Sequence, residues 1–317
     1  MIWEFIVGLI ILTLGSEALL RGAAGVKRRF GVPDFIIGLV IVGFGTSLPE
    51  LVIGFGAASV GAEELALGMV MGSNIFNLLG VLGLAALIAP LATDERALKR
   101  DGLFMAAAAL SLAALSMTGR LDRWGGLLLL AGLAVYIATV FIDEKRLPVG
   151  RVSLYRAKAD FARHGPRAPW LAGLFLLAGG LLVTLGAGWV IEATVGLAFD
   201  LGVGEDVLGL TLVAIATSLP EFLVSIIAAQ RRQYGVACGS ILGSNIFNIF
   251  GVGGLIALVF PAVFPTRLAG PDMAVLVGVS LIILIALATG RRLSRGEGGL
   301  ALAAYAVYGL WRTGAFV

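Results

Sequence analysis

Long apolar runs separated by short polar segments repeat along almost the whole chain. A membrane-spanning helix needs about 20 predominantly apolar residues. Ten runs in this sequence are long enough, or nearly so, to form such helices. We therefore expect an all-α polytopic membrane protein with ten transmembrane helices, at residues 2–20, 35–58, 65–88, 103–117, 124–142, 171–195, 207–229, 236–260, 273–288 and 300–310.

The composition agrees with a lipid environment. Hydrophobic residues make up 59% of the chain and charged residues 14%, with a mean hydropathy of +1.01, whereas a soluble domain carries about a quarter charged residues. The net charge of +3 does not indicate a nucleic-acid partner, because the basic residues stand in short loops between apolar runs. We expect the chain to be embedded in the lipid bilayer. We expect it to bind no nucleic acid and no cofactor and to need no obligatory protein partner.

The positions of lysine and arginine predict the orientation in the membrane, because cytoplasmic loops carry an excess of both. With the N-terminus outside, 19 of the 23 basic residues fall in loops on the inner side. We therefore expect a multi-pass protein of the cell (inner) membrane with both termini outside and a cytoplasmic central loop. The first run is flanked by Glu4 and Glu17 and lacks a basic leader, so we interpret it as a retained helix.

The chain contains an internal repeat with an offset of 171 residues. Thr-Ser-Leu-Pro-Glu occurs at 46–50 and again at 217–221, and Gly-Ser-Asn-Ile-Phe-Asn occurs at 72–77 and again at 243–248. Repeats with matching interruptions in their helices are typical of secondary transporters, whose sites lie near the bilayer midplane.

Each half contains five predicted helices, an odd number. The second copy must therefore cross the membrane in the opposite direction to the first. We therefore predict two inverted five-helix repeats with broken helices at the midplane. The expected organisation is a first repeat at 1–142, a basic cytoplasmic linker at 143–169 and a second repeat at 170–317.

Glu50 and Glu221 are equivalent in the repeat and lie deep in apolar runs, with no lysine or arginine within a helical turn. An ionised carboxylate inside hydrocarbon costs roughly 3 kcal/mol or more. One interpretation is structural, since Ser-Leu-Pro-Glu is also a capping box with Ser47 or Ser218 as the N-cap. The interpretation we favour adds a cation, because proline frees backbone carbonyls that need a partner in a membrane.

The second motif adds neutral oxygen atoms. Ser73 and Asn77 are four residues apart, hence on one helical face, and Ser244 and Asn248 repeat this spacing. Small residues here also favour close helix packing, and we expect Phe76 to serve packing. Oxygen-only ligands suit hard cations such as calcium, and two carboxylates could hold one divalent ion, two sodium ions or two protons. The candidate ligands are Glu50, Glu221, Asn77, Asn248, Thr46, Thr217, Ser47, Ser218, Ser73 and Ser244.

These motifs resemble the alpha repeats of the cation/calcium exchanger superfamily, and most of all those of prokaryotic sodium/calcium exchangers. The resemblance covers nearly the whole chain. It implies that Glu50 and Glu221 are the principal calcium ligands and that alternating access moves the first and sixth helices over the core. It also implies sodium sites formed with the four serines and carbonyls from the two threonines, namely Ser47, Ser73, Ser218, Ser244, Thr46 and Thr217.

Asn248 departs from this resemblance, because well-studied sodium/calcium exchangers of this type carry aspartate at that position. The sequence therefore predicts an antiporter that exchanges calcium for sodium, with a proton/calcium or other divalent cation exchanger as the alternative. A cation channel is disfavoured by the inverted repeat. A membrane enzyme is disfavoured because no nucleophile and base occur together.

Overall fold

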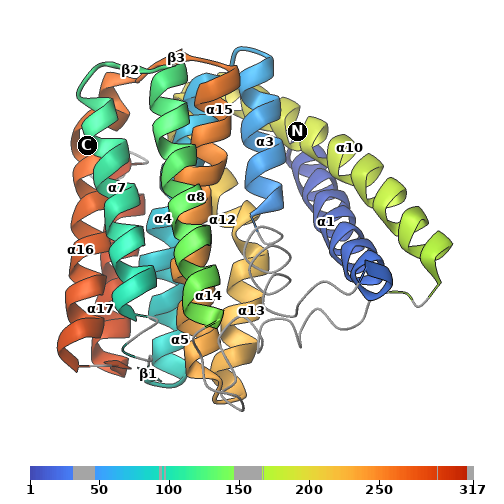
Figure 1. The fold of residues 1–317 in the computed structure, drawn as a ribbon. Helices are drawn as coiled ribbons and strands as arrows, with labels where there is room; N and C mark the ends of the chain where they lie inside the picture. The colour runs from blue at the N-terminus through green and yellow to red at the C-terminus, as the bar shows by residue number, and fades with distance from the viewer. Residues whose placement is uncertain are drawn as a thin grey trace.

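The computed structural model describes residues 1–30, 47–92, 95, 98–145, 166, 168–290 and 292–312, which are almost entirely helical (Figure 1). Several helices contain a π-helical segment, labelled η. The elements in chain order are α1 (Ile2–Phe30), α3 (Leu48–Ser59), α4 (Glu63–Phe76), η2 (Asn77–Val81), α5 (Leu82–Ile88), β1 (Leu91–Ala92), η3 (Leu98–Gly102), α7 (Leu103–Ser116), β2 (Arg120–Leu121), α8 (Arg123–Lys145), α10 (Pro169–Leu201), α11 (Glu205–Leu208), η4 (Gly209–Val213), α12 (Ala214–Thr217), α13 (Leu219–Gln230), α14 (Tyr234–Ile246), η5 (Phe247–Gly253), α15 (Gly254–Val259), β3 (Ala262–Val263), η6 (Leu268–Asp272), α16 (Met273–Gly290), β4 (Arg292–Leu293) and α17 (Arg295–Arg312).

Apolar side chains cover the outside of this bundle as well as its core. Leu177, Leu181 and Leu185 on α10 are 77%, 62% and 51% exposed, which suits contact with lipid tails. Within the described residues, six helical stretches are long and apolar enough to cross a membrane. A seventh results if Glu205–Thr217 and Leu219–Gln230, bent by 47°, count as one span. Each predicted run coincides with described helices except at 35–46, which lie outside the described residues, and the count of ten stays a prediction.

The helices break where the two Ser-Leu-Pro-Glu segments stand. Ser47 and Ser218 are the N-cap residues of α3 and α13, and a proline occupies the first turn of each helix. The position of the caps is therefore as predicted. The capping box itself is not, because neither serine side chain makes a cap hydrogen bond. The Ser218 hydroxyl donates instead to a carboxylate of the other half, as described below.

Two short antiparallel ladders, which the all-α prediction did not include, join the two halves. β1 pairs with β4 and β2 pairs with β3. With the offset of 171 residues, Leu91 corresponds to Ala262 and Leu121 to Arg292, so the two ladders are equivalent. The β2–β3 ladder lies at the top of Figure 1 and β1 lies at the bottom. Each end of the bundle therefore carries one ladder between the halves.

Helix contacts repeat in the same way. α5 packs against α17 of the second half, and its counterpart α15 packs against α8 of the first half. The predicted packing role of Phe76 is confirmed, since its ring contacts Tyr305 at a centroid distance of 5.1 Å. The core is thus built from helices that each pack against the opposite half.

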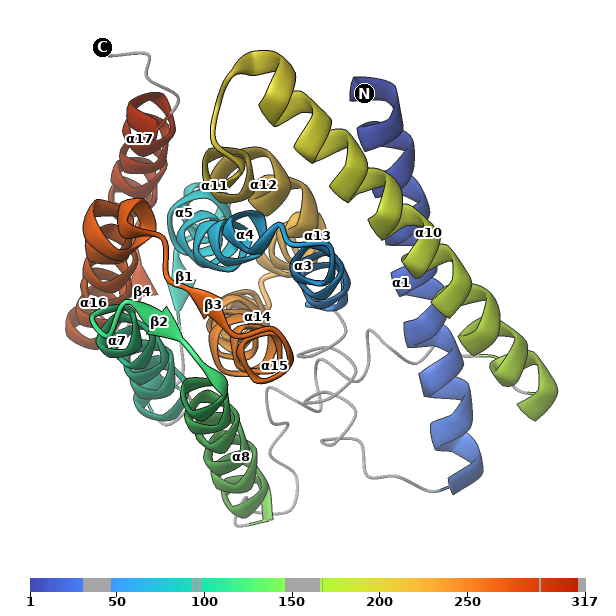
Figure 2. The same cartoon turned by 90° about the horizontal axis from the view of Figure 1, so that it is seen from above.

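α1 and α10 form a separate pair along one side of the bundle (Figure 2). Glycines let their backbones approach closely: a Cβ on Gly15 would lie 2.6 Å from the nitrogen of Val183, and one on Gly186 would lie 2.5 Å from the nitrogen of Leu12. Close approach through small residues is the usual basis of helix association in membranes. The pair also packs against α3, which begins at the first Ser-Leu-Pro-Glu segment.

Candidate cation-binding site

Glu50 and Glu221 stand at the third residue of α3 and α13, directly after the helix breaks. Both side chains are fully buried, and the hydroxyl of Ser218, the N-cap residue of α13, donates to the Glu50 carboxylate. The positive end of each helix dipole favours a carboxylate at this place. The structure therefore brings together the two acidic residues that the repeat predicted.

Contacts around Glu50 come from the other half of the chain. The Ser218 hydroxyl donates to Oε1 of Glu50 at 3.4 Å, and the hydroxyls of Ser73 and Thr217 lie 3.3 Å apart. The second carboxylate oxygen of Glu50, Oε2, is buried without a hydrogen-bond partner among the described residues. The site is thus formed between the halves, and one carboxylate oxygen is left for another ligand.

The amide side chains of the second motif are buried, and some of them are hydrogen-bonded to the other half. Asn77 begins the π-helical segment η2, and Asn248 lies within its counterpart η5. Asn77 donates from Nδ2 to Oδ1 of Asn245 at 3.1 Å, and Asn245 donates from Nδ2 to the carbonyl oxygen of Asn74 at 3.2 Å. π-helical segments are rare and frequently mark functional sites.

Several oxygens in this region lack hydrogen-bond partners among the described residues. They include Oγ of Ser47, Oδ1 of Asn77 and Oδ1 of Asn248, all on buried side chains. Leaving a buried polar group unpaired costs about 1–3 kcal/mol. A cation coordinated by these oxygens would remove that cost, and hard cations prefer such ligands. No group of three acidic, histidine or cysteine side chains suited to a metal occurs in the described part of the chain, so the two glutamates would supply the charge.

Nine of the ten candidate ligands lie in the described residues, and all nine are buried. Thr46 lies outside them. Glu50 is hydrogen-bonded to Ser218, and Ser73 is hydrogen-bonded to Thr217. Ser244 is buried on α14. Asn74 and Asn245 are not among the predicted ligands, although both stand in the repeated Gly-Ser-Asn segment and a hydrogen bond between them joins the halves.

The structure also buries three carboxylates that the sequence analysis did not single out. Asp101, Asp206 and Asp272 are each at most 1% exposed, and each forms an ion pair with an arginine. Their partners are Arg100 and Arg312. These ion pairs lie apart from the two glutamates.

The comparisons with known proteins cover both halves of the chain. A family model described as sodium/calcium exchanger protein matches residues 1–142 and 171–314. The putative antiporter CaxA of Alkalimonas amylolytica is 32% identical over 306 residues, which cover 96% of this chain and 95% of that protein. The sodium/calcium exchanger MaX1 of Methanosarcina acetivorans is 32% identical over 334 residues, which cover 96% of this chain and 95% of that protein.

A solved structure has the same overall fold. The sodium-calcium exchanger NCX_Mj, soaked with sodium and strontium ions, matches with a TM-score of 0.64 and 29% identity over 96% of both chains. A second structure of NCX_Mj gives a TM-score of 0.65 over 97% of this chain and 96% of that chain.

Proposed function

The chain belongs to the sodium/calcium exchanger protein family, and on this premise we propose that it exchanges calcium for sodium across the membrane by alternating access. Its relatives are named exchangers and antiporters, so it is a transporter and not an enzyme. The observation that carries the proposal is the pair of buried carboxylates, Glu50 and Glu221, at the start of two equivalent broken helices.

In the proposed site Glu50 and Glu221 bind calcium and neutralise its charge. Sodium ions occupy neighbouring positions when calcium leaves, because the buried carboxylates are costly to leave without a counter-cation. The neutral oxygens around the pair would complete the coordination of either ion. We assign them to Asn77, Asn248, Ser47, Ser73, Ser218, Ser244, and the carbonyls of Thr46 and Thr217.

The proposed architecture consists of two inverted five-helix repeats, residues 1–142 and 170–317, joined by a cytoplasmic linker at 143–169. The equivalent ladders at opposite ends of the bundle support it, as do the two separate segments that the family model matches. α1 and α10 would move together over the core, because they pack closely with each other at one side of it (Figure 2). We place both termini outside the cell membrane.

A second candidate is proton/calcium exchange at the same site. Asn248 favours this candidate, because it is an amide where well-studied sodium/calcium exchangers carry aspartate. Its Nδ2 and Oδ1 atoms have no hydrogen-bond partner among the described residues. One carboxylate fewer leaves less charge for sodium. Protons on the two glutamates would still balance the departure of one calcium ion.

The test uses the purified chain in sodium-loaded liposomes diluted into sodium-free buffer, with radioactive calcium outside. Calcium uptake that disappears without the sodium gradient, and in Glu50→Gln, is the expected result. Uptake driven by an imposed pH gradient and not by sodium would support the proton-coupled candidate. Calcium uptake by Glu50→Gln at the wild-type rate would overturn the assignment of the site.

A further inference from the structure

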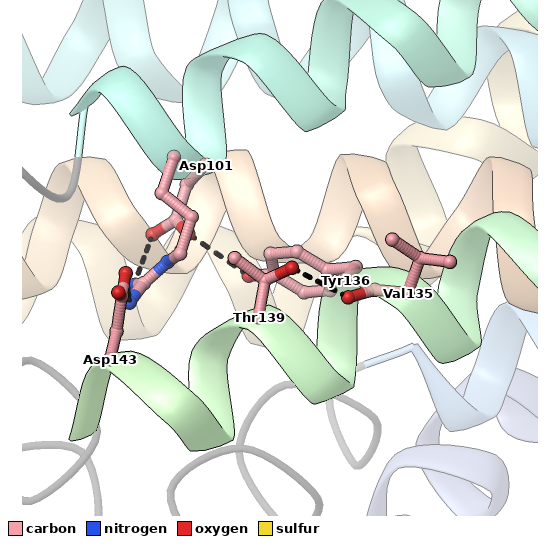
Figure 3. Close-up of polar contacts among 6 residues, drawn as sticks. Asp101, Val135, Tyr136, Thr139 and Asp143 are labelled. Carbon is pink, nitrogen blue, oxygen red and sulfur yellow. Dashed lines mark hydrogen bonds and ion pairs between the residues drawn. The ribbon is translucent and has the colours of Figure 1, made fainter. Parts of the chain in front are cut away.

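Each half of the chain contains, away from the cation site, a cluster of charged residues around a buried tyrosine. The first-half cluster consists of Arg100, Asp101, Tyr136 and Asp143 (Figure 3). Arg100 donates to Asp101 at 2.7 Å and to Asp143 at 3.3 Å, and the Tyr136 hydroxyl donates to Asp101 at 3.3 Å. Asp101 lies in η3, directly before α7.

The second-half cluster consists of Asp206, Asp272, Tyr308 and Arg312. Arg312 donates from Nη2 to Asp206 at 2.9 Å, and its Nε lies 3.2 Å from Asp272. The Tyr308 hydroxyl donates to Asp272 at 2.8 Å. Asp272 is the counterpart of Asp101 at the offset of 171 residues, and it too lies in a π-helical segment before an apolar helix. The two clusters therefore share one plan.

The two clusters differ in which elements carry the carboxylates that pair with the arginine. Arg100 contacts carboxylates of η3 and α8, and neither element carries a candidate ligand. Arg312 instead contacts Asp206 in the first turn of α11. The first-half position equivalent to Asp206 is Phe35, which lies outside the described residues. Among the described residues, the contact between an arginine and the first turn of a half-helix occurs in the second half.

Asp206 lies in the first turn of the half-helix Glu205–Thr217, which is formed by α11, η4 and α12. The other end of the half-helix, about 18 Å away by helical rise, leads to Thr217 and Ser218. These residues contact Ser73 and Glu50 in the cation site. The half-helix therefore runs from Arg312 to the cation site.

The half-helix is also packed tightly along its length. A Cβ on Gly68 would lie 2.7 Å from the carbonyl oxygen of Asp206, and one on Gly209 would lie 2.6 Å from that of Leu65. Contacts between backbones leave little room for adjustment by side chains. A shift of Asp206 is therefore transmitted along the half-helix.

Building on the proposed exchange, we propose that Arg312 is a positioning residue that sets the half-helix Glu205–Thr217 so that Thr217 and Ser218 meet their partners in the cation site. Asp206 and Asp272 share its guanidinium and are at most 1% exposed. Without it, two buried carboxylates repel each other and Asp206 moves outward. The half-helix follows, and the hydroxyls at its other end leave Ser73 and Glu50.

The experiment compares Arg312→Gln with Arg100→Gln in the reconstituted full chain. Both variants remove a guanidinium that bridges two carboxylates, and α8 packs on η5 as α17 packs on η2. Arg100→Gln is therefore the control for the loss of such an ion pair, with the difference that the Asp143 side chain is 29% exposed and that of Asp206 is 1% exposed. We expect Arg312→Gln to raise the calcium KM about three- to thirtyfold, with a smaller change in kcat. The control should change KM less than about twofold, although both variants lose thermal stability.

Two further measurements keep the inference falsifiable. Asp206→Asn weakens the contact between Arg312 and α11 without creating repulsion, so it should raise the calcium KM in the same direction by a smaller factor, and it serves if Arg312→Gln does not fold. Arg312→Lys should restore part of the affinity, because lysine pairs with carboxylates without the fork geometry of arginine. Hydrogen exchange of the amides in Glu205–Thr217 should quicken in Arg312→Gln and not in Arg100→Gln. Equal effects of the two glutamine variants on KM and on hydrogen exchange would overturn the inference. A wild-type chain without calcium exchange would contradict the proposed function instead, and hydrogen exchange would still decide the role of Arg312.

Discussion

Gly72 stands where α4 and the half-helix Glu205–Thr217 are in backbone contact. A Cβ on residue 72 would lie 2.4 Å from the carbonyl oxygen of Leu210 and 2.6 Å from its Cα. Favourable contacts between heavy atoms lie at about 3.5–4.0 Å, so Gly72→Ala creates an overlap of about 1 Å. The atoms concerned belong to the backbone, and no change of side-chain rotamer relieves it. The substitution therefore forces the two helices apart.

The expected loss follows from two opposing contributions. Alanine in place of glycine stabilises a helix interior by about 0.5–1 kcal/mol, while overpacking a close contact costs about 1–3 kcal/mol. We expect a net loss of about 1–2 kcal/mol in the free energy of unfolding. Because Ser73 and Thr217 are in contact next to this point, we also expect calcium exchange to slow by about tenfold, as small displacements of aligned groups do in other sites.

The assay is thermal unfolding in detergent, followed by sodium-driven calcium uptake in liposomes. Gly278→Ala on α16 is the matched control, since no atom of another described element lies within 4 Å of the added Cβ there. That variant should keep or slightly raise the midpoint and should transport normally. If Gly72→Ala unfolds and transports like Gly278→Ala, the contact between α4 and the half-helix is not as close as described.

Three further predictions concern single side chains. Glu221→Gln should reduce calcium exchange to the level of empty liposomes while the thermal midpoint stays the same or rises, because a buried charge is removed; normal exchange would exclude Glu221 as a ligand. Asn248→Asp adds a carboxylate and should steepen the dependence of uptake on the sodium gradient, and an unchanged sodium response would show that this position does not set the coupling. Ser294 donates hydrogen bonds that hold the pKa of the Glu297 carboxyl below its ordinary value. These bonds should stabilise the start of α17 at pH values above the ordinary pKa of a glutamate, and the stabilisation should be lost as the pH falls through the lowered pKa of Glu297. Hydrogen-exchange protection of the first turn of α17 checks this at neutral and acid pH, with Ser294→Ala, which keeps the backbone hydrogen bond to Glu297 and loses the hydroxyl one, as the control that should respond less.

The positions of the helices could be predicted because the thickness of the bilayer dictates the length of an apolar run. The glutamate pair could be predicted because the repeat marks both members and the cost of burial singles them out. The π-helical segments could not, since nothing in the sequence of η2 or η5 marks the extra residue in a turn. The Arg312 ion pair could not be predicted either, because its partner Asp206 is 106 positions away along the chain.

Two segments with the same spacing show how surroundings decide a local motif. Ser294 and Glu297 form the capping box that Ser-x-x-Glu predicts: the Ser294 backbone nitrogen donates to the Glu297 carboxylate at 2.7 Å, and the Glu297 nitrogen donates to the Ser294 hydroxyl at 3.3 Å. Ser47 and Glu50 have the same spacing and form no such box. Glu50 is buried and accepts a hydrogen bond from the Ser218 hydroxyl of the other half, whereas Glu297 lies at the exposed start of its helix. The local preference is satisfied where no more distant partner competes.

The pairing of each half with the other also bears on how the protein is made. Because α5 packs on α17 and α8 packs on α15, the first half cannot complete its packing when it leaves the ribosome. The partners of Ser73 and Glu50 are synthesised 144 and 168 residues later, roughly 10–30 s at ordinary rates of translation. During that interval the membrane holds a half-protein with an uncompensated carboxylate. Its insertion therefore depends on shielding by water, a proton or the insertion machinery until Ser218 arrives.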